Sequence, residues 1–243
     1  MQIDLARMRE DFRAMKRRRG ASTEHLARRC APAAYHYDYL LMEALNRNMV
    51  ELLSRVRPAA GRGVALDVGS STSPYRQRLH AAGFETRTLD IDAAARPDFV
   101  GSVEDTGLPE ASFDLAVCTQ VLEHLPRPLV ALREIRRVLK PGGHLILAVP
   151  HVWPYHPCPG DFWRFTQEGV AEMCRSAEFE IVTLLGAGGC SVTLFQTMNR
   201  SGLTWSCWAR RRTADTRTPD AAASAAVNSM TGRKIGTWSR AWA

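Results

Sequence analysis

The sequence predicts an α/β fold, in which a mostly parallel sheet carries helices on both faces. Short apolar runs that suit buried strands alternate with segments whose apolar residues recur at helical spacing. The dipeptide Pro141-Gly142 marks a turn from one such helix into the next strand. A chain of 243 residues, 45% hydrophobic and 23% charged, is long enough to bury a core of this kind.

Five strands and two helices follow from these patterns. The second helix is the clearest, because its apolar residues fall on one side and Arg133, Glu134, Arg136 and Arg137 on the other. We expect strands at 64–68, 85–90, 113–118, 144–149 and 181–185, and helices at 74–82 and 129–139.

The two ends of the chain differ from this pattern. Residues 2–19 could form a short basic helix, and residues 35–57 repeat apolar side chains near helical spacing until Pro58 stops them. After about residue 198 the apolar residues follow neither the strand period nor the helix period, so we expect disorder or loose packing there. The predicted division is a basic, helical extension (1–59), an α/β domain (60–198) and a polar basic tail (199–243). We expect residues 205–243 to be dispensable for cofactor binding.

The net charge of +7 belongs to the ends. Residues 1–29 carry 9 basic and 4 acidic side chains and residues 200–243 carry 8 and 2, which leaves 15 basic against 19 acidic between them. A central region with a net negative charge lacks the broad positive face that nucleic acids require, so we expect no nucleic-acid partner. The basic ends are expected to be solvated, although Arg17, Arg18 and Arg19 could contact an anionic membrane surface.

Cysteine usage indicates a cytoplasmic protein. Six cysteines are scattered without a CxxC pair, so we expect reduced thiols and no metal site. No stretch of about 18 apolar residues runs without charge, and the first ten residues lack the apolar segment of a signal peptide. We therefore expect no transmembrane segment. The oligomeric state stays open.

The strongest functional signal is the segment VALDVGSSTSPY, residues 64–75. An apolar strand ends in Asp67 and passes through Gly69 into a loop of small residues before a helix. Gly69 lets a nucleoside cofactor approach the backbone closely, and a helix N-terminus would offer N–H donors to a carboxylate. Asp67 could accept a hydrogen bond from an ammonium group. Alone this arrangement is a weak signal, because many doubly wound domains share it.

The second strand makes the signal specific. It ends in Asp90, 23 positions after Asp67, near the spacing at which a carboxylate meets a bound ribose. A carboxylate can accept hydrogen bonds from both ribose hydroxyls, so we assign Asp90 to the ribose. The alternative role for Asp90 is a helix N-cap, and Asp92 is expected to be solvated.

With these motifs the sequence resembles the class I S-adenosylmethionine-dependent methyltransferases, in the broad subgroup of the methyltransferase domain 11 type. The resemblance covers half of the chain, from residue 64 to about 185, through LDVGSS, TLDID, GSVEDTGLP, SFDLAVCTQVLEHLPRP and REIRRVLKPGGHLILAVP. It implies a Rossmann-like fold with a mostly parallel seven-stranded sheet and helices on both faces. Here an N-terminal helical extension would pack near the mouth of the site. S-adenosylmethionine is the implied cofactor.

The resemblance also implies which residues hold that cofactor. They come from the ends of the first, second and fourth strands and from the loop between the second strand and the fourth. They are Asp67, Gly69 and Ser71 for the methionine part, Asp90 for the ribose, Ile91, Val103 and Glu104 for the adenine, and Cys118, Thr119 and Gln120 beside the sulfonium.

The chain departs from the family pattern in two places. The family usually has three glycines in the first loop, where this chain has Gly69, Ser71 and Ser73. Where an acidic residue often faces the adenine amino group, the chain has Ser102. Serine is small enough to fit, but these departures leave the affinity for the cofactor and the geometry of the loop open.

A second constellation, HPCPGDFWRFT at residues 156–166, follows the fifth strand, where class I methyltransferases place substrate-facing elements. It resembles the HxxPxDYWRFT segment of methyltransferases often associated with saccharide and cell-surface glycan biosynthesis. His156 and Asp161 are candidate bases, and His156 is favoured because the unperturbed pKa of histidine lies near physiological pH. We assign His124, Tyr155, Trp163 and Arg164 to the acceptor substrate.

Structural roles are open for several of these residues. Asp161 and Arg164 could form an internal ion pair, with Trp163 filling the core. This interpretation and direct contact with the substrate are equally good. Glu123 could cap or pair locally, and His124 could be a partly buried structural histidine.

The predicted function is S-adenosylmethionine-dependent methylation, on oxygen, of a small-molecule or saccharide acceptor. An RNA or protein methyltransferase that uses the basic ends is the next enzyme class, and the acidic centre argues against it. A catalytically silent Rossmann-like binding module is the alternative that Ser71 and Ser73 favour. A nicotinamide dehydrogenase fits least, because GSSTSP is not GxGxxG.

Overall fold

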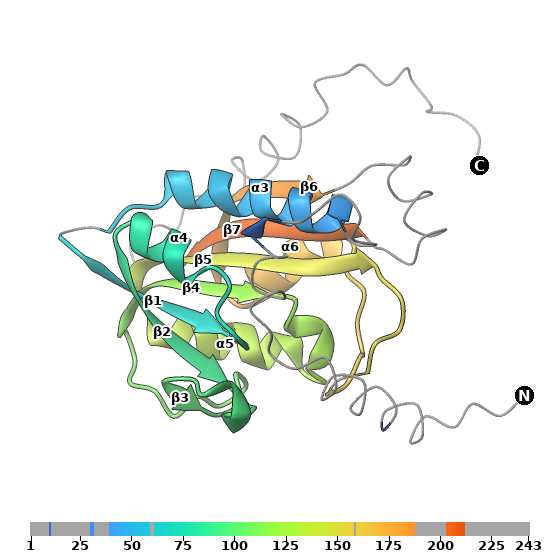
Figure 1. Ribbon diagram of the computed structural model, residues 1–243, viewed down its shortest axis with the longest axis horizontal. Coiled ribbons are helices and arrows are strands. Elements are labelled where there is room, and N and C mark those ends of the chain that lie inside the picture. The colour runs from blue at the N-terminus through green and yellow to red at the C-terminus, as the bar shows by residue number, and fades with distance from the viewer. Residues whose placement is uncertain are drawn as a thin grey trace, which may run out of the picture.

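The sheet has seven strands in the order β3-β2-β1-β4-β5-β7-β6, and all neighbours are parallel except where β7 pairs with β5 and β6 (Figure 1). The computed structural model describes residues 10, 30–31, 39–58, 61–157, 159–187 and 203–211. The strands are β1 (Gly63–Val68), β2 (Phe84–Asp90), β3 (Phe99–Val100), β4 (Phe113–Thr119), β5 (Leu139–Val152), β6 (Phe179–Ala187) and β7 (Leu203–Arg211). A mostly parallel, seven-stranded sheet is thereby confirmed.

Helices cover both faces of this sheet, as the sequence predicts. α3 (Tyr39–Arg55) and α4 (Arg76–Ala81) lie on one face, and α5 (Pro128–Val138) and α6 (Gln167–Ser176) lie on the other (Figure 1). Two short 3₁₀ turns, η1 (Ala93–Ala95) and η2 (Leu122–His124), follow β2 and β4. No helix in the described part of the chain is long and apolar enough to cross a membrane.

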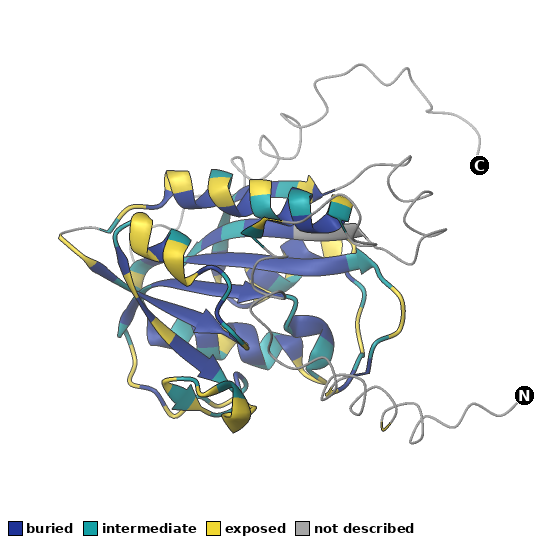
Figure 2. Cartoon of the chain, in the orientation of Figure 1, coloured by how far each residue is buried: buried dark blue, intermediate teal, exposed yellow. Residues whose placement is uncertain are grey.

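Alternating side chains of the strands build two separate cores. Ala65, Leu115 and Ile146 pack with residues of α3 and α4, whereas Leu66 and Leu147 pack with residues of α5 and α6. This two-residue alternation is what strands buried on both faces require. Figure 2 shows the result, with buried residues along the strands and exposed ones on the outer sides of α3 and α4.

The helical extension is described only in its last part. α3 falls within the predicted 35–57 segment and packs against β5, β6 and β7. Its first turns bring Leu41 and Leu45 against Ala148, with Trp153 beside them, near the end of β5. The predicted helix at 2–19, with its arginines, lies outside the described residues, as do Cys158 and Cys190. The four described cysteines carry free thiols.

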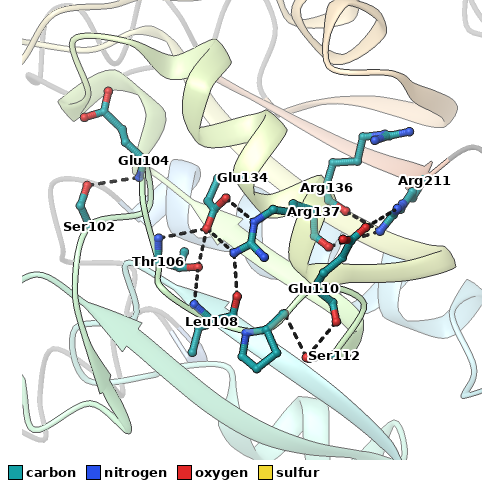
Figure 3. A network of polar contacts seen from close by, with 11 residues as sticks. Ser102, Glu104, Thr106, Leu108, Glu110, Ser112, Glu134, Arg136, Arg137 and Arg211 are labelled. Atoms are coloured by element: carbon teal, nitrogen blue, oxygen red, sulfur yellow. Dashed lines mark hydrogen bonds and ion pairs between the residues drawn. The ribbon is translucent and has the colours of Figure 1, made fainter.

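The domain boundary at residue 198 is wrong, because β7 lies inside the sheet between β5 and β6. Cys207 and Ala209 are almost fully buried against the α5 and α6 side. Arg210 and Arg211, whose charges suggested a solvated tail, have hydrogen-bond partners at the end of β7. Arg210 pairs with Glu180 at 2.8 Å. Figure 3 shows how Arg211 donates to the last carbonyls of α5, those of Arg136 at 3.1 Å and Arg137 at 3.3 Å. Residues 212–243 of the predicted tail lie outside the described residues.

Removal of β7 is therefore expected to unfold the domain, in contrast to the expectation that residues from 205 onward are dispensable. A chain ending at residue 202 leaves both β5 and β6 without their neighbour and exposes their backbone hydrogen-bonding groups. A chain ending at Arg211 keeps the whole sheet and is the control. Thermal melting by circular dichroism should show a cooperative transition only for the longer chain. Equal melting temperatures would contradict this placement of β7.

A partly buried carboxylate, that of Glu134, ties the segment after β3 to α5. Glu134 accepts hydrogen bonds from the Thr106 backbone N–H at 3.0 Å, from the Thr106 hydroxyl at 2.6 Å, and from Arg137 at 2.7 and 2.8 Å (Figure 3). The hydrogen bonds from Arg137 and Thr106 outweigh the effect of burial and lower the pKa of Glu134 from 4.5 to about 2. The loop that carries Val103 and Glu104 is thereby held against the helix.

The Glu134→Gln variant should lower the free energy of unfolding at pH 7 by about 1–3 kcal/mol. Because the pKa of Glu134 is lower in the folded state than in the unfolded chain, this stabilisation is complete above about pH 4.5 and is lost as the pH falls toward 2. Urea unfolding from pH 3 to 7 measures the difference. Glu172→Gln is the matched control, because the pair of Glu172 with Arg175 has the same spacing but an exposed carboxylate. Equal effects of both variants at every pH would refute the assignment.

Candidate functional site

The predicted cofactor residues gather at the carboxyl ends of β1, β2 and β4. β1 pairs with β2 on one side and with β4 on the other, and the strand order reverses at this point. Open α/β sheets bind their ligands in the crevice outside such a reversal, because the loops on either side turn to opposite faces. The candidate site therefore begins at the loop that follows Val68.

Gly69 fits the role that the sequence gives it. Its φ is +63°, and a Cβ at this position would collide with the side chain of Val121. Its backbone N–H and that of Ser70 both donate to the carbonyl of Leu89, at 2.8 and 3.2 Å. Glycine is thus required both by the backbone angle and by the close approach of the β4 loop.

The two serines of this loop adopt the backbone conformation for which glycine is usual. Ser71 and Ser73 have φ values of 47° and 49°, which cost a residue with a Cβ about 1–2 kcal/mol each. Ser73 offsets part of this cost, because its hydroxyl donates a buried hydrogen bond of 2.7 Å to Asp67. Asp67 is 2% exposed, so this contact fixes the carboxylate at the end of β1. The serines therefore preserve the loop geometry that a glycine would allow.

Asp90 lies where the sequence predicts, at the end of β2. One carboxylate oxygen accepts from the Ser71 N–H at 2.7 Å and the other from the Asp92 N–H at 2.9 Å. The alternative role as a helix N-cap belongs instead to Asp92, whose side chain accepts from the Ala94 N–H at 3.0 Å at the start of η1. Asp92 is exposed to solvent, as the sequence analysis expects, and caps η1 in addition.

The predicted adenine residues differ in accessibility. Ile91 is 66% exposed just after β2, which suits a residue that covers one face of a base. Val103 is 6% exposed and packs into the core, so only its backbone could meet the adenine edge. Glu104 pairs with Arg127 at 3.2 Å, and its N–H donates to the Ser102 hydroxyl at 3.2 Å. Ser102 thus stabilises the turn that presents this segment.

Two of the three predicted sulfonium residues at the end of β4, Cys118 and Thr119, have buried side chains. Cys118 is fully buried, and burial together with nearby carboxylates raises the pKa of its thiol far above the ordinary value, which makes it inert. Thr119 is 8% exposed. Gln120 turns the chain with a φ of 56° while its N–H donates to the Ala148 carbonyl at 2.8 Å.

The loop after β5 lies against η2. The Phe162 N–H donates to the Glu123 carbonyl at 2.8 Å, and the Trp163 indole N–H donates to the Leu125 carbonyl at 2.8 Å. A ring nitrogen of His124 contacts the Gly160 carbonyl. Because η2 follows β4 directly, these contacts place the predicted acceptor loop beside the predicted sulfonium position.

Asp161 and Arg164 form the internal ion pair that the sequence leaves open. Two guanidinium nitrogens meet the two carboxylate oxygens at 2.5 and 2.8 Å, and Arg164 also donates to the carbonyls of Trp153 and Pro154 at 2.9 and 3.1 Å. Burial alone would raise the pKa of Asp161, but the hydrogen bonds from Arg164 and the His156 N–H lower it. A buried carboxylate held in this way is a weak base.

His156 is the better placed base of the two. Its Nδ1 faces the Pro154 carbonyl at 3.0 Å and the Asp161 carboxylate at 3.2 Å. Two acceptors at Nδ1 favour the tautomer that carries its proton there, which leaves Nε2 to accept one. Burial, the largest influence, lowers the pKa of His156 and keeps the ring neutral near pH 7.

Sequence patterns missed one neighbour of this histidine. Glu123 is fully buried, its carboxylate lies 3.9 Å from Nε2 of His124, and the rings of His124 and His156 stand edge to face at 4.9 Å. Potential ligand atoms of Glu123, His124 and His156 all lie within 4.8 Å of one another, so these three side chains could hold a metal ion. The sequence spacing of these residues does not predict the group, because His156 comes close to Glu123 and His124 only when its loop folds back.

The other predicted acceptor residues lie on the surface of the same loop. Tyr155 is 39% exposed and Trp163 is 42% exposed, so Trp163 does not fill the core. Phe162 beside them is 48% exposed. The loop that carries His156 thus exposes three aromatic side chains, and aromatic faces of this kind can pack against a ring or a sugar face.

This fold and this site define a Rossmann-like domain for a nucleoside cofactor. Residues 66–147 match the family described as "Methyltransferase domain". Over these residues the chain is similar to class I S-adenosylmethionine-dependent methyltransferases. The matched residues contain Asp67, Gly69, Asp90 and Gln120 but end before the loop of His156.

Curated relatives agree with this assignment over part of their length. The ubiquinone biosynthesis O-methyltransferase of Xanthomonas axonopodis pv. citri (strain 306) is 32% identical over 123 residues, which cover 44% of this chain and 51% of the relative. The protein of that name from Xanthomonas oryzae pv. oryzae (strain PXO99A) is 30% identical over 122 residues, with coverages of 44% and 51%. The chain thus spans about half the length of the curated relatives it matches.

Solved structures share the fold at low sequence identity. The 1,6-didemethyltoxoflavin-N1-methyltransferase of Burkholderia thailandensis, solved with 1,6-didemethyltoxoflavin and S-adenosylhomocysteine, is 19% identical, with a TM-score of 0.56 over 86% of this chain and 88% of that chain. The [4+2]-cyclase SpnF is also 19% identical, with a TM-score of 0.55 over 70% and 83%. At this level the similarity shows the fold alone.

The Asp90→Ala variant should weaken S-adenosylmethionine binding by about 1.5–3 kcal/mol, the cost of losing charge-assisted hydrogen bonds. Isothermal titration calorimetry measures the affinity, and circular dichroism checks that the variant is folded. Asp92→Ala is the matched control, because it removes a nearby carboxylate that caps η1. An unchanged affinity in a folded Asp90→Ala variant would remove Asp90 from the site.

Proposed function

We propose that this protein is an S-adenosylmethionine-dependent O-methyltransferase that acts on a hydroxyl group of a small molecule or saccharide. The observation that carries the proposal is the position of His156. It is a neutral imidazole beside the end of β4, held by Asp161 and Pro154 and facing His124. A hydroxyl acceptor needs such a base, because its proton must leave as the new bond forms.

The residues of the first half of the site fit the cofactor. The Gly69 loop leaves room where a Cβ would collide with Val121, and Asp90 presents a carboxylate at the end of β2. Asp67, Gly69 and Ser71 would hold the methionine part, Asp90 the ribose and Ile91 the adenine. When bound, the cofactor supplies an electrophilic methyl group on a sulfonium.

The residues of the second half act on the acceptor. The carboxylate of Asp161 orients His156 through Nδ1, and Nε2 accepts the proton of the acceptor hydroxyl. The rigid attachment of this loop to η2 would align the acceptor oxygen with the methyl group, and such alignment is a large part of catalysis. Asp161 serves here as a positioning residue and no longer as an alternative base.

The acceptor class is supported from two directions. The exposed faces of Tyr155, Phe162 and Trp163 suit the flat apolar face of a sugar or an aromatic ring. The curated relatives that match this chain are named for O-methylation in ubiquinone biosynthesis. Both observations favour a hydroxyl-bearing small molecule or saccharide.

The His156→Ala variant should lower turnover by about 10²- to 10⁴-fold while S-adenosylmethionine affinity stays nearly unchanged, because His156 acts on the acceptor. Since burial lowers the pKa of His156, the activity of the unmodified protein should persist to pH values below the ordinary 6.5 before protonation removes it. His80→Ala, at an exposed histidine on α4, is the control. Steady-state turnover with phenolic and saccharide acceptors, together with calorimetry of cofactor binding, tests both statements. Loss of cofactor binding in a folded His156→Ala variant would show that this loop closes over the cofactor instead.

A further inference from the structure

A cavity lies near the ends of β5, β6 and β7 that are opposite to the candidate site. Its volume is about 500 Å³, and its walls come from the end of α3, the starts of β5 and β6, and the end of β7. His144 in its wall stands opposite Arg210 across the β5–β7 pair, eight residues before Val152, where β5 ends. The candidate acceptor loop begins at that far end of β5, so the two sites are separate.

Guanidinium groups dominate this cavity. Arg55, Arg57 and Arg210 line it, and Glu180 is the acidic residue in its lining. Arg55 is engaged, because it donates to Thr183 at 3.2 Å and to Glu51 at 2.7 Å. The cavity therefore keeps an excess of positive charge that no carboxylate of its lining balances.

Two of the arginines keep donors available. Arg57 uses one terminal nitrogen for the carbonyls of Leu53 and Val56, at 3.0 and 2.9 Å, and Arg210 uses one for Glu180 at 2.8 Å. Among the residues that the structure describes, Nε and the other terminal nitrogen of each have no hydrogen-bond partner. A fixed guanidinium with an open edge matches the paired oxygens of a phosphate.

The cavity also has a flat aromatic surface. The Trp208 indole N–H donates to Nδ1 of His144 at 3.1 Å, and the two rings lie 5.3 Å apart with a tilt of 54°. Burial and the nearby Arg210 lower the pKa of His144, so this ring is neutral near pH 7. An aromatic base can stack on such a surface next to the arginines.

We propose that this cavity binds a small phosphorylated nucleoside, with the phosphate on Arg57 and Arg210 and the base against Trp208. A volume of about 500 Å³ falls in the range of small-molecule sites. The residues that line this cavity lie outside the candidate methyltransferase site, so the two assignments can fail independently.

Calorimetric titration with uridine monophosphate and guanosine monophosphate tests the proposal. Saturating S-adenosylhomocysteine is present throughout, so that the cofactor site is occupied. At least one nucleotide should bind, and Arg57→Gln and Arg210→Gln should each weaken it about tenfold or more, the effect of losing charge-assisted hydrogen bonds. Arg133→Gln, at an exposed arginine on α5, is the matched control and should leave binding unchanged.

Two further titrations fix the ligand class. Uridine and inorganic phosphate, each alone, should bind at least tenfold more weakly than the nucleotide, and Trp208→Phe should weaken the nucleotide more than it weakens phosphate. The proposal is overturned if neither nucleotide binds while S-adenosylhomocysteine occupies the cofactor site, or if binding survives both arginine substitutions. Phosphate binding as tight as nucleotide binding would overturn the role of the base.

Discussion

The parallel pairing of β1 between β2 and β4 is the constraint on which the cofactor half of the site depends. Val68 stands level with Leu89 on one side and with Cys118 on the other, so the three strands end within a residue or two of one another. The loops that begin at Gly69, Ile91 and Gln120 therefore start at the same edge. Because buried backbone groups must all be paired, this register cannot slip without exposing the core of both faces.

The acceptor half depends on different interactions, which are specific to one loop. Residues 153–157 and 159–165 contain no helix or strand, and polar contacts hold them in place. The pair of Arg164 with Asp161 closes the loop on itself, while Phe162 and Trp163 attach it to η2. A charged pair of this kind adds less to stability than its Coulomb energy suggests, because both ions lose solvent. Its consequence is geometric, since Asp161 then fixes the ring of His156.

Sequence periodicity predicted those parts of the fold in which local pattern and burial agree. The strands at 64–68, 85–90 and 113–118 and the helix at 129–139 appear within one or two residues, because each has its own apolar face. β7 was missed because its neighbours in the sheet are distant in sequence and its arginines satisfy backbone and carboxylate partners at the sheet end. Val103 was placed at the adenine edge by motif alone, and its inward orientation depends on packing that no motif encodes.

Residues that could be predicted from the sequence lie within the family match, whereas residues that depend on the folding of a loop lie outside it. Asp67, Gly69 and Asp90 lie within the matched residues 66–147, and their spacing could be found in the sequence because the strand–loop–strand geometry fixes it. His156 and Asp161 lie beyond the match, and their contact with Glu123 and His124 arises only when the loop folds back on η2. A cyclase and a methyltransferase both share this fold, so the fold leaves the reaction undetermined. The proposed function therefore assigns recognition of the acceptor to the loop after β5, which presents Tyr155, Phe162 and Trp163 with exposed side chains.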